Sequence, residues 1–273
     1  PKGIMNPGKI VDSQKINENL RYGADYKATE WDTYFDFSKQ NGLAGSIEMC
    51  SGVGVCRRKL EGNMCPSFRA TLDERDSPRG RANALRAIIS GKLPKEELTS
   101  ERLYEVFDLC LMCKSCKSEC PSKVDIAKLK YEFLGQYYKE HSLPLRSLLF
   151  GNIDLLSKFG SAFAPVSNWF MTNGLFAFFM DKLVGIDKRR KFPTFARNTF
   201  KKWYKNRNGE NGSNTEAKQV VFFFDTFVNH NEPHIGIALV KVLEAAGFEI
   251  ILPDKKCCGR PMISKGLIEK AIK

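Results

Sequence analysis

The sequence predicts a mainly α-helical protein that ends in a smaller α/β unit, and three observations support this. Two cysteine-rich runs, within 50–65 and 110–120, are followed by segments with apolar residues at helical spacing. The stretch 208–217 is rich in asparagine and glycine, which is typical of a linker. After this linker, a helical segment lies between two short apolar runs, which is the pattern of a βαβ unit.

Helix signals lie between and after the cysteine runs. Ser77 is suited to cap a helix whose first residue is Pro78 and which stops near Gly91. A second helix is expected over Glu101–Leu109, leading into the second cysteine run. The capping signature Ser122-x-x-Asp125 opens a third helix. Its apolar side comprises Ile126, Leu129, Phe133 and Tyr137.

Strand signals occur at three places. Thr33–Phe37 is expected as a short strand. Val220–Phe224 is a continuous apolar run, as in a strand that is covered on both faces. A helix over Pro233–Ala246 separates it from a further strand, Phe248–Leu252. The chain has three histidines, which we expect at the surface or in capping positions: His141, His230 and His234.

The composition argues against a secreted disulfide framework. The chain has 273 residues, enough for two domains. Its nine cysteines form three tight groups, whereas a disulfide scaffold distributes them along the chain. A reducing, cytoplasmic setting with metal ligands fits this pattern better. The chain begins at Pro1 and shows no signal segment, so we expect it to be part of a longer polypeptide.

The second cysteine run has the spacing C-x2-C-x2-C-x3-C-P, formed by Cys110, Cys113, Cys116 and Cys120. This spacing is typical of bacterial iron–sulfur proteins, where three thiolates in a tight loop face three irons of one cubane. The fourth cysteine points to a second cubane. Zinc is the alternative, but zinc ribbons bring together two C-x2-C pairs that are far apart in sequence. The spacing therefore favours an iron–sulfur cluster.

The first cysteine run repeats the second with one ligand missing. Cys50 and Cys56 are six positions apart, like the first and third cysteines of the second run. Cys65 is followed by proline, like the fourth. Val53 stands at the middle position and has no donor atom. This half therefore offers three thiolates where the other offers four.

Crossing the last cysteine of each run, as two-cluster ferredoxins do, assigns two ligand sets. A 4Fe–4S cluster takes Cys65, Cys110, Cys113 and Cys116. The second site takes Cys50, Cys56 and Cys120. Three outcomes stay open there: a 3Fe–4S cluster, a 4Fe–4S cluster with an outside ligand, or a half that holds no cluster. Arg79 and Arg81 are either cations beside a negatively charged cluster or ordinary charges on a helix surface.

The order and content of these segments resemble the iron–sulfur extension of FAD-linked oxidases, the flavin enzymes that oxidise D-2-hydroxy acids. The matching stretches are 1–10, 35–38, 48–57, 64–67, 79–84 and 124–130. The resemblance implies that 1–12 is the tail of an upstream FAD-linked oxidase domain. It also implies that 40–140 is an α-helical two-cluster ferredoxin-like domain. The C-x5-C…C-P spacing is similar to the three-iron site in iron–sulfur subunits of succinate dehydrogenase.

Connecting helices, first apolar and then basic, are expected over 141–207. Residues 159–180 carry no charge and are rich in aromatic side chains, but their prolines, glycines and asparagines disfavour a bilayer-spanning helix. We expect a buried or interfacial helical hairpin. The basic residues of 188–207 form a solvated face or meet an anionic membrane leaflet. Nucleic acid binding also fits a net charge of +12, but we expect no nucleic acid as partner.

The third cysteine group, Cys257-Cys258-Gly259, follows the last expected strand, at the sheet edge where ligands usually lie. Two sulfurs and the backbone of a glycine, which has no side chain, can contact one cofactor there. The alternative interpretation is that the two cysteines are small buried residues. The group resembles the CCG cysteine-rich domain of heterodisulfide reductase and of glycolate oxidase iron–sulfur subunits. We therefore expect 218–273 to be the first part of a CCG domain, with an incomplete site.

The resemblance implies an iron–sulfur electron-transfer module of a flavin-dependent D-2-hydroxy-acid dehydrogenase, acting on a substrate such as lactate, glycolate or 2-hydroxyglutarate. FAD belongs to the upstream flavin domain, and the electron acceptor is a quinone or another carrier. This chain alone lacks the flavin and substrate sites, so we expect no catalytic residue in it. The expected location is cytoplasmic, with peripheral contact at the inner face of the cell membrane.

Two alternatives stay open at this point. The first is a separate iron–sulfur subunit of a glycerol-3-phosphate or lactate-utilisation dehydrogenase. The second is a zinc-stabilised basic module that binds nucleic acid or a membrane.

Overall fold

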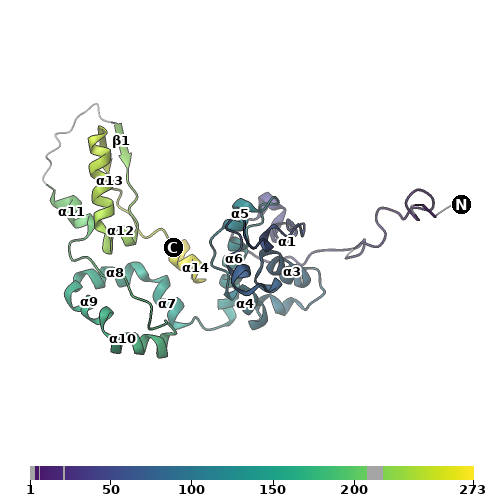
Figure 1. The fold of residues 1–273 in the computed structure, drawn as a ribbon, viewed down its shortest axis with the longest axis horizontal. Coiled ribbons are helices and arrows are strands. Elements are labelled where there is room, and N and C mark those ends of the chain that lie inside the picture. Colours follow the sequence, from purple (N-terminus) through teal and green to yellow (C-terminus); the bar gives the residue numbers. More distant parts are fainter. Residues whose placement is uncertain (1–3, 6, 21, 208–217) are drawn as a thin grey trace. The chain divides into compact units, whose positions relative to one another are not determined.

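A computed structural model describes residues 4–5, 7–20, 22–207 and 218–273. The chain divides into two compact units, Pro1–Glu140 and His141–Lys273, which are treated separately below. Helices predominate, and the described residues contain two strands, so the predicted mainly α class is confirmed (Figure 1). The predicted linker 208–217 lies outside the described residues. So do four positions of the predicted upstream tail, at 1–3 and 6.

The helices of the first unit lie between Ser38 and Glu140, and its described residues before Ser38 form no helix or strand. Its α-helices are α1 (Gly42–Glu48), α2 (Pro66–Thr71), α3 (Pro78–Ile89), α4 (Glu101–Asp108), α5 (Ser115–Glu119) and α6 (Ile126–Glu140). Short 3-10 turns lie between them: η1 (Ser38–Gln40), η2 (Val55–Arg57), η3 (Glu74–Asp76) and η4 (Lys95–Thr99). One apolar core joins the helices, with the rings of Phe107 and Phe133 stacked inside it. Three cysteines belong to this core: Cys56, Cys65 and Cys116.

The helices beside the cysteine runs begin largely as the sequence predicts. The hydroxyl of Ser77 accepts a hydrogen bond from the N–H of Gly80 (2.9 Å), and proline occupies the first position of α3. The predicted second helix is confirmed as α4, one residue shorter. α6 starts later than the signature at Ser122 suggests. Its first turn is capped by Asp125, whose carboxylate accepts the N–H of Lys128 at 3.0 Å.

The predicted strand at Thr33–Phe37 is wrong, because a buried carboxylate takes the place of a partner strand. The N–H groups of Tyr34 and Phe35 donate to Glu132 of α6, at 2.9 and 3.0 Å. Glu132 is 1% exposed and also accepts the side-chain amide of Gln136. Since these partners are about a hundred positions apart in the chain, local periodicity could not reveal them.

The second unit combines helices with a two-stranded parallel sheet. Its elements before the sheet are α7 (Leu145–Gly151), α8 (Ile153–Ala162), α9 (Ala164–Thr172), α10 (Gly174–Phe179), the π-helical turn η5 (Met180–Val184) and α11 (Phe200–Asn206). They are followed by β1 (Lys218–Val221), α12 (Thr226–His230), α13 (Pro233–Ala245), β2 (Phe248–Ile251), α14 (Arg260–Ser264) and α15 (Ile268–Ile272). A small core joins Phe200, Phe224, Val240 and Ile250.

The predicted βαβ unit is present, with one difference. β1 and β2 pair in parallel, with Lys218 opposite Phe248, and α12 and α13 form the crossover. β1 starts and ends earlier than the apolar run 220–224 suggests, and most of its side chains are exposed. The prediction of a strand covered on both faces is therefore wrong. The apolar run instead leaves the strand after Val221, so that Phe224 reaches the core.

His230 is buried, so its predicted surface position is wrong. It is 5% exposed, its Nδ1 lies 2.9 Å from the hydroxyl of Ser161, and its Nε2 lies 2.9 Å from the amide of Asn229. Burial lowers the pKa of His230 below its usual value. The polar face of α8 supplies the serine, and this pairing allows a histidine in the interior of the unit.

The role of Glu132 can be tested by substitution. Glu132→Ala leaves two backbone N–H groups without their acceptor, so we expect a loss of about 2 kcal/mol of stability. We also expect faster hydrogen exchange across residues 33–37. Glu105→Ala removes an exposed carboxylate from α4 and serves as the matched control. Unchanged exchange in Glu132→Ala would contradict the assigned role.

Candidate metal centre

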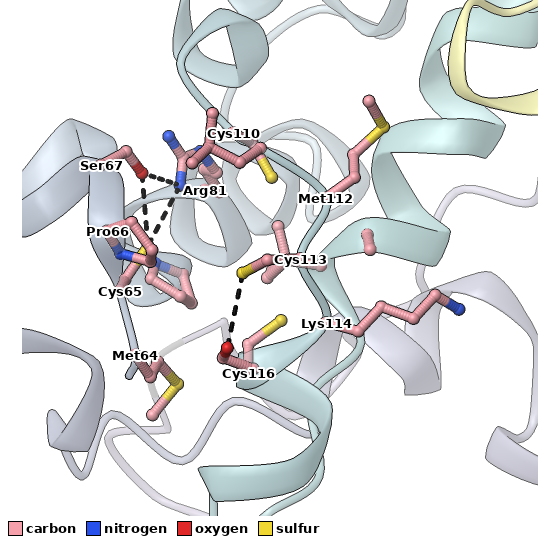
Figure 2. Close-up of a pocket in the computed structure, with 15 residues that line it drawn as sticks. Met64, Cys65, Pro66, Ser67, Arg81, Cys110, Met112, Cys113, Lys114 and Cys116 are labelled. Carbon is pink, nitrogen blue, oxygen red and sulfur yellow. Dashed lines mark hydrogen bonds between the residues drawn. The ribbon is translucent and has the colours of Figure 1, made fainter. Parts of the chain in front are cut away.

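Four cysteines from two separate segments line one pocket of the first unit (Figure 2). Cys110, Cys113 and Cys116 come from the loop between α4 and the first turn of α5. Cys65 comes from the residue directly before α2. Figure 2 shows the four side chains around this pocket. Residues 45 or more positions apart in sequence thus meet at one site.

A second pocket holds the remaining cysteines of the two runs. It is lined by Cys50, Cys56 and Cys120. Val53 also lines this pocket and is 61% exposed. The structure therefore brings the last cysteine of each run to the pocket of the other run. Metal ligation by these seven residues stays a prediction.

The two pockets adjoin each other. Met64, Pro78 and Cys116 line both of them, and Met64 is 1% exposed. Only a thin layer of side chains therefore separates the two sites. Such an arrangement suits the transfer of single electrons between two clusters.

The cysteine at the third ligand position of each run, Cys56 or Cys116, lies at the N-terminus of a helix. The Cys116 thiol accepts hydrogen bonds from the N–H groups of Ile126 and Ala127, the first residues of α6. The Cys56 thiol accepts one from the N–H of Arg79, in the first turn of α3. Free N–H groups and the helix dipole both stabilise negative charge at such a position. Both pockets are therefore prepared for thiolates.

As long as no metal is bound, burial counteracts the stabilisation of the thiolates by these N–H groups. It raises the pKa of the Cys116 thiol to about 11, and it also raises the pKa of Cys56. Both groups are then neutral thiols near pH 7. Because only thiolates bind iron, cluster assembly has to release their protons.

Buried cations hold the loops that carry the first cysteine of each run. On α3, the Arg86 guanidinium donates to the carbonyl of Cys50 at 2.7 Å. On α6, the Lys130 ammonium donates to the carbonyls of Cys110 at 2.9 Å and Phe107 at 2.7 Å. Both cations are less than a tenth exposed. The sequence analysis missed these two residues, although a lysine among the apolar residues of α6 was a signal.

Arg81 places a positive charge beside the first pocket. Its side chain is fully buried, and Nη1 lies 3.9 Å from the sulfur of Cys65 and 3.1 Å from the hydroxyl of Ser67. Nε donates to the carbonyl of Val106 at 3.0 Å. The carboxylate of Asp76 lies 3.7 Å from Nη2 and offsets part of this charge. Arg81 therefore has the position expected of a cation beside a negatively charged centre.

Arg79 has a different environment from Arg81. It is paired with Glu74 at 2.7 Å, and this pairing raises the pKa of Arg79 and lowers that of Glu74. Its Nη1 also donates to the carbonyl of Gly52 at 3.2 Å, in the loop that lines the second pocket. The Arg79 side chain thus supports this loop by binding a backbone carbonyl of the loop.

Glu119 ties the two cysteine runs together. Its carboxylate accepts the N–H groups of Asn63 at 2.9 Å and Met64 at 3.0 Å, and these bonds lower the pKa of Glu119. Gly62 comes so close that an added Cβ would lie 2.5 Å from this carboxylate. The segment before Cys65 is thereby held against α5. Nothing in the spacing of the second run pointed to Glu119, because its partners are backbone groups.

The third cysteine group lies after β2 in the second unit. Cys257 is half-buried and Cys258 is exposed. The sulfur of Cys257 lies 3.9 Å from the hydroxyl of Thr226, which donates to Asp154 at 3.0 Å. Gly259 precedes α14 with a φ of +72°, a conformation that favours glycine. Cofactor binding by Cys257, Cys258 and Gly259 stays a prediction.

The donor chemistry of the first pocket fits an iron–sulfur cluster. All nine cysteines are free thiols, and soft thiolates are the ligands that such clusters take. Within the described residues, no group of three His, Cys, Asp or Glu side chains could hold a single metal ion. The thiolates that bind a cluster need not converge on a single ion, since iron and sulfide fill the space between them.

Comparison with known proteins agrees with the site. Residues 46–124 match the family model of the 4Fe–4S dicluster domain, and this range contains all seven cysteines of the two pockets. The chain is 33% identical over 155 residues to a subunit of the anaerobic glycerol-3-phosphate dehydrogenase of Escherichia coli, covering 56% of this chain and 38% of that protein. No solved structure matches the chain.

Two further relatives are similar to different lengths of the chain. D-2-hydroxyglutarate dehydrogenase of Escherichia coli is 20% identical over 317 aligned positions, which cover 100% of this chain and 31% of that enzyme. The glycolate oxidase iron–sulfur subunit of the same organism is 37% identical over 78 residues, which cover 29% of this chain and 17% of that protein. The chain thus spans about a third of the length of the first relatives.

The crossed arrangement predicts which site Cys65→Ala damages. We expect the cluster at Cys110, Cys113 and Cys116 to be lost or converted, while the second site keeps its signal. Iron analysis and electron paramagnetic resonance of the reduced protein measure this. Cys258→Ala is the control and should leave both signals intact. A loss confined to the site of Cys50 and Cys56 would refute the crossing.

The missing ligand at position 53 gives a second prediction. Val53→Cys supplies a fourth thiolate to the second pocket, so a three-iron centre should become a four-iron centre with a changed paramagnetic spectrum. Val53→Ala adds no donor and should leave the spectrum as it is. If both variants give the parent spectrum, the assignment of a three-iron centre fails.

Proposed function

We propose that this chain, with its 4Fe–4S dicluster domain at residues 46–124, is the electron-transfer part of a flavin-dependent D-2-hydroxy-acid dehydrogenase. The observation that carries the proposal is the pair of adjoining pockets lined by seven cysteines of two crossed runs. When bound, iron–sulfur clusters accept and release single electrons at potentials that burial and hydrogen bonds tune.

The residues around the pockets have defined roles in this proposal. Cys65, Cys110, Cys113 and Cys116 hold a 4Fe–4S cluster, and Cys50, Cys56 and Cys120 hold a second cluster. Arg81 stabilises negative charge at the sulfur of Cys65. Arg86, Lys130 and Glu119 keep the loops in place before the clusters bind. Met64 and Pro78 keep water from the space between the two sites.

The whole-chain similarity to D-2-hydroxyglutarate dehydrogenase supports a flavin partner. FAD would be bound by an upstream domain, of which 1–12 is the tail, and 40–140 would be the ferredoxin-like domain. Residues 141–207 would be connecting helices and 218–273 the first part of a CCG domain. Cys257, Cys258 and Gly259 would bind a further cofactor, and a quinone or carrier protein would be the acceptor. The proposed location is cytoplasmic, in contact with the inner face of the cell membrane.

A second candidate is a separate iron–sulfur subunit of a glycerol-3-phosphate or lactate-utilisation dehydrogenase. It is favoured by the 33% identity to the anaerobic glycerol-3-phosphate dehydrogenase subunit, which exceeds the 20% identity to D-2-hydroxyglutarate dehydrogenase. In that case the flavin would be bound by another polypeptide. The molecular mass and flavin content of the native protein discriminate the two candidates.

Metal analysis of the anaerobically purified protein tests the proposal. We expect a brown protein with matching amounts of iron and acid-labile sulfide, and two paramagnetic centres after partial reduction. Addition of a D-2-hydroxy acid to the complete protein, with its flavin domain, should bleach the visible absorbance. A colourless protein that contains zinc would contradict the proposal and favour the zinc-stabilised module. Removal of iron with a chelator should destabilise the first unit, because seven thiols then lose their partners.

A further inference from the structure

An apolar surface lies exposed on the second unit. No helix in the described part of the chain is long and apolar enough to cross a membrane. Nevertheless, α8, α9, α10 and the residue between α8 and α9 expose large apolar side chains, including six that are 50–71% accessible. We call this surface the aromatic face and define it by Phe159, Phe163, Trp169, Phe170, Leu175 and Phe179. Single exposed apolar residues are ordinary, but these six lie on successive helices that pack against one another or on the turn between them, and large exposed apolar surfaces mark binding sites.

The helix that begins this surface has the reverse of the usual distribution of side chains. On α8, Ser157 and Ser161 are 1% and 5% exposed, and Gly160 is also buried, whereas Phe159 is 60% exposed. A helix packed on a protein core in water buries its large apolar residues and exposes its polar ones.

This inverted pattern is fixed by close contacts inside the unit. The ring of Phe195 lies on Gly160, where an added Cβ would come within 2.5 Å of the ring. Ser161 is held by His230 at 2.9 Å. Rotation of α8 to bury Phe159 would break both contacts, so the aromatic face stays directed outward.

Basic residues lie beside the aromatic face. The run Lys188–Lys191 is exposed and is held near α10 by the contact between the rings of Phe176 and Phe192, 6.4 Å apart. Asp187 pairs with Arg189. Among the described residues, the other three cations of the run have no carboxylate partner.

We propose that the aromatic face and the run Lys188–Lys191 bind together to the surface of an anionic lipid bilayer. Aromatic side chains, tryptophan above all, favour the boundary between lipid headgroups and acyl chains, and lysine and arginine attract anionic headgroups. The helices α8–α10 are too short to cross a bilayer, but helices of this length can lie in the plane of the membrane surface. The proposal rests on the location proposed above and depends on no cluster chemistry.

Vesicle flotation of the full chain tests this. We expect binding to vesicles of phosphatidylcholine mixed with phosphatidylglycerol, and much weaker binding to phosphatidylcholine alone. The combined variant Phe163→Ser, Trp169→Ser and Phe170→Ser should abolish binding. The combined variant Lys188→Glu, Arg190→Glu and Lys191→Glu should weaken it by about a hundredfold or more, since each basic residue lost at such a surface weakens binding about fivefold.

A matched control replaces apolar residues elsewhere that are at least as exposed: Ile16→Ser, Leu60→Ser and Val242→Ser, at sites 98%, 94% and 66% exposed. This control should bind like the parent. Absence of vesicle binding by the parent would overturn the proposal. So would a parent that self-associates through the aromatic face without binding vesicles, because a second copy then covers it. Iron content, measured in every variant, separates failure of this proposal from failure of the electron-transfer function.

Discussion

The first unit depends on the meeting of Cys65 with the loop that contains Cys110, Cys113 and Cys116. The pocket that they share closes a long stretch of chain and is lined by residues of α2, α3, α5 and α6. Glu119 holds the same junction by accepting hydrogen bonds from the backbone N–H groups of Asn63 and Met64. A cluster bound at this junction would couple metal binding to folding, because the four thiols of the pocket gain their partners only when the metal binds.

The same kinds of contact hold the cysteine loops of the two pockets. In each run, the first cysteine is held by a buried cation, Arg86 or Lys130, and the cysteine at the third ligand position lies at the N-terminus of a helix, α3 or α6. The plan differs at position 53, where valine replaces a thiol, and this is the only one of the eight ligand positions without a donor. The supporting structure of the second pocket is nevertheless retained.

Cysteine spacing and helix signals predicted much of this organisation. The mainly α class, the start of α3 at Ser77 and the helix over 233–246 all followed from local rules. What local rules could not predict are the long-range polar contacts. Glu132 binds the backbone at Tyr34 and Phe35, and His230 is buried beside Ser161. In each case the deciding partner is far away in sequence, so neither propensity nor periodicity reports it.

The aromatic face is a second feature that the sequence alone could predict only in part. An uncharged segment at 159–180 predicted a buried or interfacial hairpin, but only the packing of Gly160 and Ser161 shows which side of α8 is directed outward. Electron transfer in the first unit and surface binding in the second would then place the clusters near a membrane-borne acceptor. Under these two proposals, the units would contribute separable properties to one process.

The central claim is the exchange of last ligands between the two runs. Anomalous diffraction at the iron absorption edge, from crystals grown without oxygen, tests it most directly. Our account predicts iron bonded to the sulfurs of Cys65, Cys110, Cys113 and Cys116, and a separate iron centre at Cys50, Cys56 and Cys120. Iron that joins Cys65 to Cys50 and Cys56, or a zinc signal in place of iron, would contradict it.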